Sequence, residues 1–281
     1  MTPSPAFAFA AVAALVPNLT PLDTLTSGFA SIARLPRGVT VTEGSRGGQT
    51  DQAPPTLYDM EGCPFCRRVR EVATELDMVV NLVPSARGSR SRDALAEYAA
   101  AAGSNVQVPF LLDGDTRLFE SEEICRHLIA KYGATVDVPG VGTGFVASAL
   151  RLGRGGLVDK SALPAPPDRP LVLYSYEGNQ FCRLVREARA ARCPTAALSP
   201  QLVASHSLLL QVLCELDLPY ELRSAGKGSP RREELKILTG GSSQCPFLLD
   251  PNSGVQLAES ADIVEYLRGR YSRGGASVGS S

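Results

Sequence analysis

The fold is decided by the stretch YDMEGCPFCRRVR, residues 58–70. A short apolar run meets two cysteines there, and an amphipathic segment begins. Apolar residues then recur at the spacing of one helix face, at Phe65, Val69, Val72, Ala73 and Leu76. The stretch therefore predicts a strand, a turn and a helix, with Cys63 at the helix N-terminus.

The position of Cys63 predicts thiol chemistry. Unpaired backbone N–H groups and the helix dipole favour a thiolate, and they lower a thiol pKa from about 8.5 toward roughly 3.5–7.5 in such motifs. Cys66, one turn later, can resolve a mixed disulfide formed on Cys63. A zinc site would need two more ligands, yet there is no second C-x-x-C, and the histidines are His127 and His206. Inert buried thiols remain an alternative, which Pro64 inside the motif disfavours.

Three short motifs carry a resemblance to a known family: Cys63-Pro64-Phe65-Cys66, Val108-Pro109-Phe110 and Glu120-Ser121. Together they resemble a glutaredoxin or the N-terminal domain of a glutathione S-transferase, which have the thioredoxin fold. The resemblance implies that glutathione, rather than a metal, is the cofactor. It implies contacts from the thiol region at Cys63, Pro64 and Phe65, from the backbone beside a cis-proline at Val108 and Pro109, and from Glu120 with Ser121 to the γ-glutamyl group.

Composition bounds the class of protein. The chain has 281 residues, 44% hydrophobic, with a net charge of −1, which suits two modest domains. The near-neutral charge gives no reason to expect nucleic acid as a partner. Seven unevenly spaced cysteines do not suggest a secreted disulfide framework. No apolar run approaches the roughly 20 residues of a membrane span, so none is predicted.

The first segment, residues 1–54, is expected to be a targeting peptide or a disordered extension. Residues 6–16 are entirely apolar, and no acidic residue precedes Asp23. A composition of Ala, Ser and Thr with few acids suits an organelle transit peptide, which predicts a chloroplast location. Because no arginine appears before Arg34, a disordered extension or a truncated gene start remains open, with a cytoplasmic location as the alternative.

Residues 55–132 are expected to form one α/β module. The pattern predicts strands at residues 56–60, 78–83, 109–113 and 117–119, and helices at residues 64–76, 91–102 and 121–132. This βαβαββα order is that of the thioredoxin-like fold, a mixed four-stranded sheet flanked by helices. Gly114 and Asp115 predict the hairpin between the last two strands. We expect Ser121 to cap the last helix and Cys125 to be packing rather than chemistry.

Residues 133–170, rich in Gly, Pro, Val and Ala, indicate a linker. Residues 171–187 then repeat the opening stretch, so we expect a second thioredoxin-like module at residues 171–272 and a disordered tail at 273–281. The second-module equivalents of the site are Asn179, Cys182, Cys245, Pro246, Glu259 and Ser260. Tandem modules of this kind resemble plant and algal plastid proteins with two glutathione-transferase N-terminal-like domains, without the all-helical transferase domain.

The second module departs from the first at its thiols. Asn179 stands where Cys63 stands, so the resolving position Cys182 lacks an attacking partner, although Asn179 can still cap a helix. Cys245 precedes Pro246 as Val108 precedes Pro109. Cys182 and Cys245 could therefore form a disulfide if their Cα atoms lie within about 7 Å. Two separately packed thiols are the alternative.

The second departure is an insertion. Glu71 to Glu75 takes 4 steps, whereas Glu187 to Glu215 takes 28, so 24 residues interrupt the first helix of the second module. The insertion, residues 189–212, contains two prolines and does not suit a helix interior. It is either a surface loop or a gene-model artefact such as a translated intron. If it is genuine, it must loop out so that the two helix halves stack.

The leading functional hypothesis is a glutathione-linked thiol–disulfide oxidoreductase. Cys63 would attack a disulfide or glutathionylated protein substrate, and Cys66 would resolve the adduct. A scaffold that binds glutathione, a partner or an iron–sulfur cluster without turnover is the alternative, which Asn179 supports for half of the chain. A conjugating glutathione transferase is a weaker third hypothesis, because the resemblance includes no all-helical domain.

Overall fold

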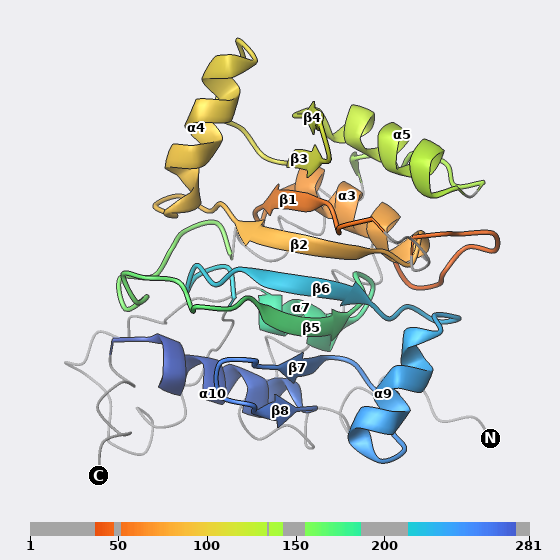
Figure 1. The fold of residues 1–281 in the computed structure, drawn as a ribbon, viewed down its shortest axis with the longest axis vertical. Coiled ribbons are helices and arrows are strands. Elements are labelled where there is room, and N and C mark those ends of the chain that lie inside the picture. Colours follow the sequence, from red (N-terminus) through yellow and green to blue (C-terminus); the bar gives the residue numbers. More distant parts are fainter. Residues whose placement is uncertain (1–36, 48–51, 134, 143–154, 187–212, 274–281) are drawn as a thin grey trace.

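The computed structural model describes residues 37–47, 52–133, 135–142, 155–186 and 213–273. These residues form an α/β fold around one mixed sheet of eight strands, in the order β4-β3-β1-β2-β6-β5-β7-β8 (Figure 1). The two predicted four-stranded sheets are present as the two halves of this sheet. The prediction of an α/β thioredoxin-like fold is confirmed.

The first half of the sheet belongs to the first module. Its strands are β1 (Thr56–Asp59), β2 (Val79–Pro84), β3 (Phe110–Asp113) and β4 (Thr116–Leu118), and its helices are α3 (Pro64–Glu75), α4 (Ser91–Ala101) and α5 (Ser121–Tyr132). Strand β1 is parallel to β2 and antiparallel to β3, which is antiparallel to β4. Every predicted element of this module is present, with ends shifted by at most one residue.

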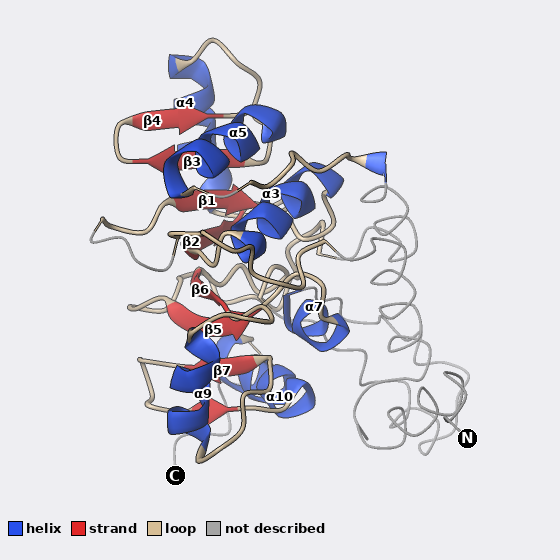
Figure 2. Ribbon diagram, turned by 90° about the vertical axis from the view of Figure 1, so that its right-hand side faces the viewer, coloured by secondary structure: helices blue, strands red, loops and turns tan. Residues whose placement is uncertain are grey.

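The second half repeats this order. Its strands are β5 (Leu171–Ser175), β6 (Tyr220–Ser224), β7 (Phe247–Leu249) and β8 (Gln256–Leu257), and its helices are α7 (Gln180–Arg186), α9 (Arg231–Thr239) and α10 (Ser260–Tyr271). The strand pairings are those of the first module. Helices α3, α5, α7 and α10 lie on one face of the sheet, and α4 and α9 lie on the other (Figure 2).

The two modules join where β2 pairs antiparallel with β6. The partners are Asn81 with Glu221 at the centre, Val80 with Leu222 on one side, and Leu82 with Tyr220 on the other. In the repeat, residues 80–82 correspond to residues 220–222, so each strand pairs with its own counterpart. This is the isologous contact of a twofold dimer, made within one chain. Each module thereby covers an edge strand that the other would expose.

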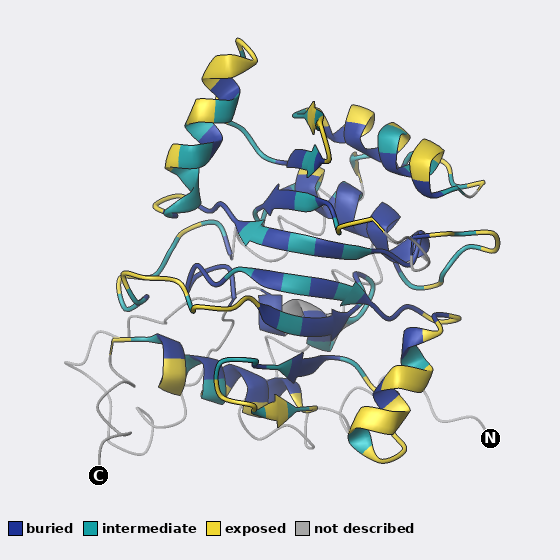
Figure 3. Cartoon of the chain, viewed as in Figure 1, coloured by how far each residue is buried: buried dark blue, intermediate teal, exposed yellow. Residues whose placement is uncertain are grey.

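The core is shared between the modules. Both joining strands alternate buried and half-buried residues, as expected for strands between two helical layers, and the sheet interior is the most buried region in Figure 3. One continuous apolar cluster contains Leu57 and Leu82 together with Leu173 and Leu222. Burial of this common cluster stabilises the two modules together, at roughly 25 cal/mol for each Å² of apolar surface removed from water.

Parts of the two predicted extra-modular segments belong to the folded structure. Val41 donates its N–H to Lys227 O at 2.8 Å, and Arg46 donates to Tyr132 O at 2.8 Å, so residues 37–47 contact both modules. In the predicted linker, Val158 donates to Arg87 O at 2.9 Å. Residues 1–36, where the targeting peptide is predicted, lie outside the described residues, as do residues 274–281 of the predicted tail. Among the helices described here, none is long and apolar enough to cross a membrane.

The helical hydrogen bonds of α7 continue across the insertion. Leu213 donates its N–H to Val185 O, and Cys214 donates to Arg186 O, both at 3.2 Å. If residues 189–212 are left out, Leu213 follows Ala188, and both bonds become i to i−4 bonds of an α-helix. The two helix halves therefore stack as the repeat requires. The insertion itself lies outside the described residues.

Deletion of residues 189–212 is expected to leave the chain folded, with its thermal midpoint unchanged or raised. The physical reason is that residues on the two sides of the insertion are already joined by helical hydrogen bonds. A shorter connection also reduces the entropic cost of closing the loop between them. Thermal unfolding followed by circular dichroism measures the effect. A large drop in the midpoint would show that the insertion packs as structure.

Candidate functional site

The start of α3 places two thiols one turn apart. Cys63 is the N-cap residue, in extended backbone with φ −83° and ψ 123°, and Pro64 opens the helix. Proline suits this position because its missing N–H would have no helical partner there. Cys63 is 6% exposed and Cys66 is fully buried. Cys63 thus keeps a small exposed area, and Cys66 has none.

The two thiols differ in acidity. A hydrogen bond from the Cys66 thiol lowers the pKa of Cys63 to about 7, against the opposing effect of burial, and backbone N–H groups at the helix start contribute. Burial and the neighbouring Cys63 raise the pKa of Cys66 well above its usual range. Near neutral pH the pair therefore holds a thiolate on Cys63 and a proton on Cys66.

Alkylation of Cys63 should follow a titration with a midpoint near pH 7, rising with pH because only the thiolate reacts. Cys66→Ala removes the hydrogen-bond donor and should move the midpoint upward, whereas Cys66→Ser keeps a hydroxyl donor and should move it less. Rates of carbamidomethylation at each cysteine, read by mass spectrometry, measure this. Cys125, whose pKa burial raises to about 12, is the internal control. Faster labelling of Cys66 or Cys125 than of Cys63 would contradict the assignment.

The structure brings the other first-module site residues to the same edge. The Val108–Pro109 peptide bond is cis, and Cys63 Sγ lies 3.9 Å from Val108 O. Gln107, next to Val108, donates from Nε2 to Glu120 Oε1 at 2.9 Å, so the exposed Glu120 carboxylate is held beside this backbone. Phe65, two residues after Cys63, is 41% exposed.

The prediction that Ser121 caps α5 is wrong. Glu120 is the N-cap residue, in extended backbone, and no side chain caps this helix end. Ser121 is the first helical residue, and its hydroxyl accepts a hydrogen bond from Arg68 Nη1 at 3.4 Å instead. Ser260 likewise begins α10 after the N-cap residue Glu259. A serine that is already inside the helix no longer has the N-cap geometry that capping requires.

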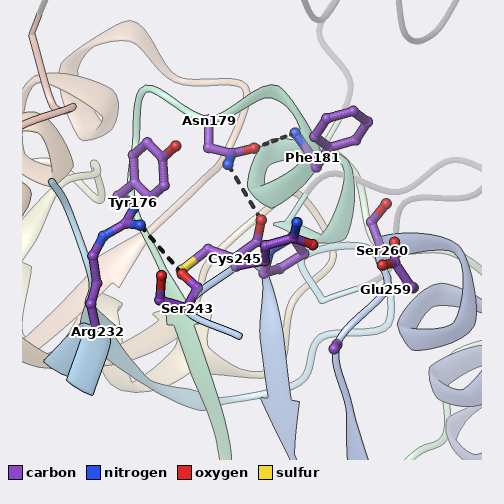
Figure 4. A pocket seen from close by; sticks show the side chains of 11 residues that line it. Tyr176, Asn179, Phe181, Arg232, Ser243, Cys245, Glu259 and Ser260 are labelled. Carbon is purple, nitrogen blue, oxygen red and sulfur yellow. Dashed lines mark hydrogen bonds between the residues drawn. The ribbon is translucent and has the colours of Figure 1, made fainter. Parts of the chain in front are cut away.

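The second module has a pocket of about 490 Å³ at the equivalent place (Figure 4). It is lined by five of the six predicted equivalents, Asn179, Cys245, Pro246, Glu259 and Ser260. The sixth, Cys182, is fully buried. The Cys245–Pro246 bond is cis, as in the first module.

Asn179 caps α7, as predicted. Its Oδ1 accepts from the backbone N–H of Phe181 at 2.7 Å and of Cys182 at 3.2 Å. Its Nδ2 donates to Cys245 O at 3.3 Å, so the same side chain also closes one side of the pocket (Figure 4). In the second module the Asn179 amide therefore occupies the position of the attacking Cys63 thiol, and these three hydrogen bonds are all to backbone atoms.

Two residues that the sequence motifs do not single out, Tyr176 and Arg232, also line the pocket. The Arg232 guanidinium lies over the Tyr176 ring, 5.5 Å from its centroid, and Nη1 donates to Ser243 O at 3.3 Å. It supplies a positive charge opposite the acidic Glu259. The signal that could have found it is repetition, because Arg92 occupies the equivalent position. Arg92 Nε donates to Ala86 O at 3.3 Å, as Arg232 Nε donates to Gly226 O at 3.0 Å.

A buried ring of charges, which no sequence motif predicts, links α3 to the second module. Glu61 Oε2 contacts Arg70 Nη2 at 2.9 Å and Arg186 Nε at 3.1 Å. Glu177 Oε2 contacts Arg70 Nε at 3.0 Å and Arg186 Nη2 at 2.8 Å. Arg67 adds a contact to Glu177 Oε1 at 3.3 Å. Glu61 and Glu177 are equivalent in the repeat, as are Arg70 and Arg186, so the ring has the twofold symmetry of the joined sheet.

The ring depends on mutual neutralisation. Its side chains are only 1–2% exposed. Burial acts to raise the pKa of Glu61, but the guanidinium groups of Arg186 and Arg70 outweigh it, so this pKa is lowered. The carboxyl of Asp59, which Arg70 Nη1 contacts at 2.6 Å, keeps a pKa raised by burial. The helix that presents Cys63 is thus fixed to both modules.

No group of three or more His, Cys, Asp or Glu side chains that could hold a metal ion occurs within the described ranges. The part of the chain that the structure describes also contains no all-helical domain.

Comparisons with known proteins found one family model and several solved structures. The family described as "Glutathione S-transferase, N-terminal domain" matches residues 57–136 and 209–275. A glutathione S-transferase from the Antarctic clam Laternula elliptica is 28% identical over 28% of this chain and 36% of its own, with a TM-score of 0.24. The apo form of glutathione S-transferase III is 33% identical over 29% of this chain and 38% of its own, with a TM-score of 0.23. The matched parts thus span well under half of those two chains.

No curated protein matches the chain at a comparable level. The two stretches that match the family together cover more than half of the 281 residues, one in each module. The chain belongs to the family of glutathione S-transferase N-terminal domains.

Proposed function

We propose that the protein is a glutathione-linked thiol–disulfide oxidoreductase that acts through Cys63 and Cys66. The observation that carries this proposal is the pair of thiols at the start of α3, one with a pKa of about 7 and the other buried and protonated. A thiolate near neutral pH beside a protonated thiol suits attack followed by resolution. Membership of the glutathione S-transferase N-terminal family supports glutathione as the co-substrate.

The reaction divides into two exchanges. The Cys63 thiolate attacks a disulfide or glutathionylated protein, forms a mixed disulfide and releases one thiolate. Cys66 then gives up its proton and attacks Cys63 Sγ, which releases the second thiol and leaves a Cys63–Cys66 disulfide. Two glutathione molecules reduce this disulfide and become glutathione disulfide, so two electrons pass from glutathione to the substrate.

We infer the glutathione contacts from the groups beside Cys63. The backbone of Val108, next to Pro109, can pair with an extended peptide. The Glu120 carboxylate, held by Gln107, can receive the γ-glutamyl ammonium group, with the Ser121 hydroxyl beside it. Pro64 and Phe65 would contact the cysteinyl part. In the second module, Arg232 and Glu259 offer charges of both signs to the same zwitterionic ligand.

A scaffold function is the second candidate, because the second pocket has Asn179 where the attacking thiol stands in the first module. In that case the modules would bind glutathione, a partner or an iron–sulfur cluster without turnover. We propose a chloroplast location on the composition of the first residues, with the cytoplasm as the alternative, and import into isolated chloroplasts tests it.

The test is turnover by the whole chain. The protein is mixed with glutathione and a glutathionylated peptide, and the oxidised glutathione formed is measured with a coupled reductase. Turnover that follows the titration of Cys63 supports the oxidoreductase. Calorimetric binding of glutathione without turnover favours the scaffold, and visible absorbance after reconstitution with iron and sulfide would indicate a cluster.

A further inference from the structure

Cys182 and Cys245 form a second pair of thiols, which the proposed function does not use. Cys182 lies in the first turn of α7 and is fully buried. Cys245 precedes Pro246 and lines the pocket of the second module, where Figure 4 shows it between Asn179 and Ser243. The two thiols are close enough to shift each other's pKa, and Cys245 Sγ also lies 4.0 Å from Ala225 O. Both are free thiols in this structure.

One side chain fixes this pair from both sides. Asn179 accepts a hydrogen bond from the backbone N–H of Cys182 at 3.2 Å and donates one to Cys245 O at 3.3 Å. The backbone of both cysteines is therefore tied to the same amide. This contact holds the start of α7 beside the residue that precedes Pro246.

The pair shares one of its two positions with the dithiol of the first module. Cys182 occupies the place of Cys66. Its partner, Cys245, does not lie at the helix start, where the second module has Asn179. Cys245 instead precedes the cis-proline, at the position that Val108 occupies in the first module. The arrangement again combines one buried thiol with one that lines the ligand-binding edge.

The surroundings of Cys182 favour a thiolate. The Arg186 guanidinium and the Ser175 hydroxyl both lie near its sulfur. Burial acts to raise the pKa of Cys182, but the Cys245 thiol, Arg186 and Ser175 outweigh it, so this pKa is lowered. Cys245 keeps its proton, since the hydrogen bond to Cys182 raises its pKa. The pair therefore carries one proton, which has to pass from Cys245 to Cys182 before the Cys245 sulfur can attack a disulfide.

We propose that Cys182 and Cys245 are a second redox site, in which a glutathione-type disulfide in the adjoining pocket oxidises the pair to an intramolecular disulfide. The proton of Cys245 moves to the Cys182 thiolate, and the Cys245 thiolate attacks one sulfur of the disulfide, releasing one glutathione thiolate. That thiolate takes the proton of Cys182. The Cys182 thiolate then attacks Cys245 Sγ and releases the second glutathione, which is protonated from solvent.

The balance is two protein thiols oxidised and one glutathione disulfide reduced to two glutathione molecules. Cys245 must react first because it lines the pocket, whereas Cys182 has no exposed surface. The site uses neither Cys63 nor Cys66, so it can function whether or not the first module turns over.

The experiment uses the full-length chain with Cys63→Ser and Cys66→Ser, which removes the first dithiol. The reduced protein is incubated with glutathione disulfide, acid-quenched, alkylated in denaturant and digested for mass spectrometry. We expect the loss of two alkylatable thiols per chain and a linked Cys182–Cys245 peptide pair. Cys214, buried with Sγ 3.1 Å from Gly155 O, is the matched control and should remain fully alkylated.

Two further variants separate the steps. Adding Cys182→Ala should stop the reaction at a glutathione adduct on Cys245. Adding Cys245→Val, which installs the residue found at position 108, should abolish both adduct and disulfide. The chain with only Cys63→Ser and Cys66→Ser keeps Cys182 and Cys245. It therefore tests whether this disulfide forms even if either further variant fails to fold.

The proposal is overturned if Cys182 and Cys245 remain fully alkylatable in that background after prolonged incubation with a large excess of glutathione disulfide. It is equally overturned if adducts appear on Cys214 as readily as on Cys245. Because the first dithiol is absent, neither result depends on the proposed activity at Cys63.

Discussion

Replacing Glu177 by glutamine is expected to destabilise the chain by about 3–5 kcal/mol, the cost of removing one partner from a buried ion pair. The Glu177 carboxylate contacts Arg67, Arg70 and Arg186, all of them nearly inaccessible to water. Glutamine has the same shape but no charge, so the variant leaves an uncompensated positive charge in the core. Chemical denaturation of the full-length chain measures the loss of unfolding free energy.

The matched control is Glu233→Gln. Glu233 pairs with Lys236 at 2.8 Å, but both side chains are largely exposed, so the loss should stay below about 1 kcal/mol. Adding Arg186→Gln to Glu177→Gln removes the excess charge and should recover part of the lost stability. Equal effects of Glu177→Gln and Glu233→Gln would show that the ring does not stabilise the fold.

The ring makes the two modules one folding unit. Without the second module, Arg67 and Arg70 would lose the Glu177 carboxylate, and β2 would expose the edge that β6 covers. The activity of either module therefore has to be measured in the intact chain, by substitution of single residues rather than by separation of the modules.

The architecture of each module could be predicted from the sequence, but the joint between them could not. Apolar spacing predicted the helix at residues 121–132 with both ends correct, because local periodicity determines it. The pairing of β2 with β6 is a contact between the edge strands of two modules that are far apart in the sequence. The alternation of residues 79–84 is the same for a covered edge and an exposed one, so local pattern cannot reveal it.

The site shows the same division. The motif placed Cys63 at a helix start, where the structure has it. The buried ring could not be predicted from single residues, because charges beside a helix start are ordinarily solvated. Only the repetition of Glu61 at Glu177 and of Arg70 at Arg186 points to a shared contact. The sequence does not decide whether Cys182 and Cys245 lie close together, because residues far apart in sequence are brought together by tertiary packing alone.

Cys63→Ser is expected to lower the reduction of a glutathionylated peptide by at least about 1,000-fold, in the range that removal of a catalytic nucleophile produces. A serine hydroxyl does not ionise near neutral pH, whereas the pKa of Cys63 is about 7. The rate is measured in the whole chain with glutathione and a coupled reductase, and circular dichroism establishes that the variant is folded.

Two further variants show whether the loss is specific to Cys63. Cys66→Ser should lower the rate less, because glutathione from solution can still resolve the adduct on Cys63 when the buried thiol is missing. Cys125→Ala, which removes a buried thiol whose pKa is raised to about 12, should leave the rate nearly unchanged. A Cys63→Ser chain that is folded and retains a substantial part of the wild-type rate would refute Cys63 as the nucleophile. Because Cys182 and Cys245 are still present in that chain, they would then be the next pair of thiols to replace.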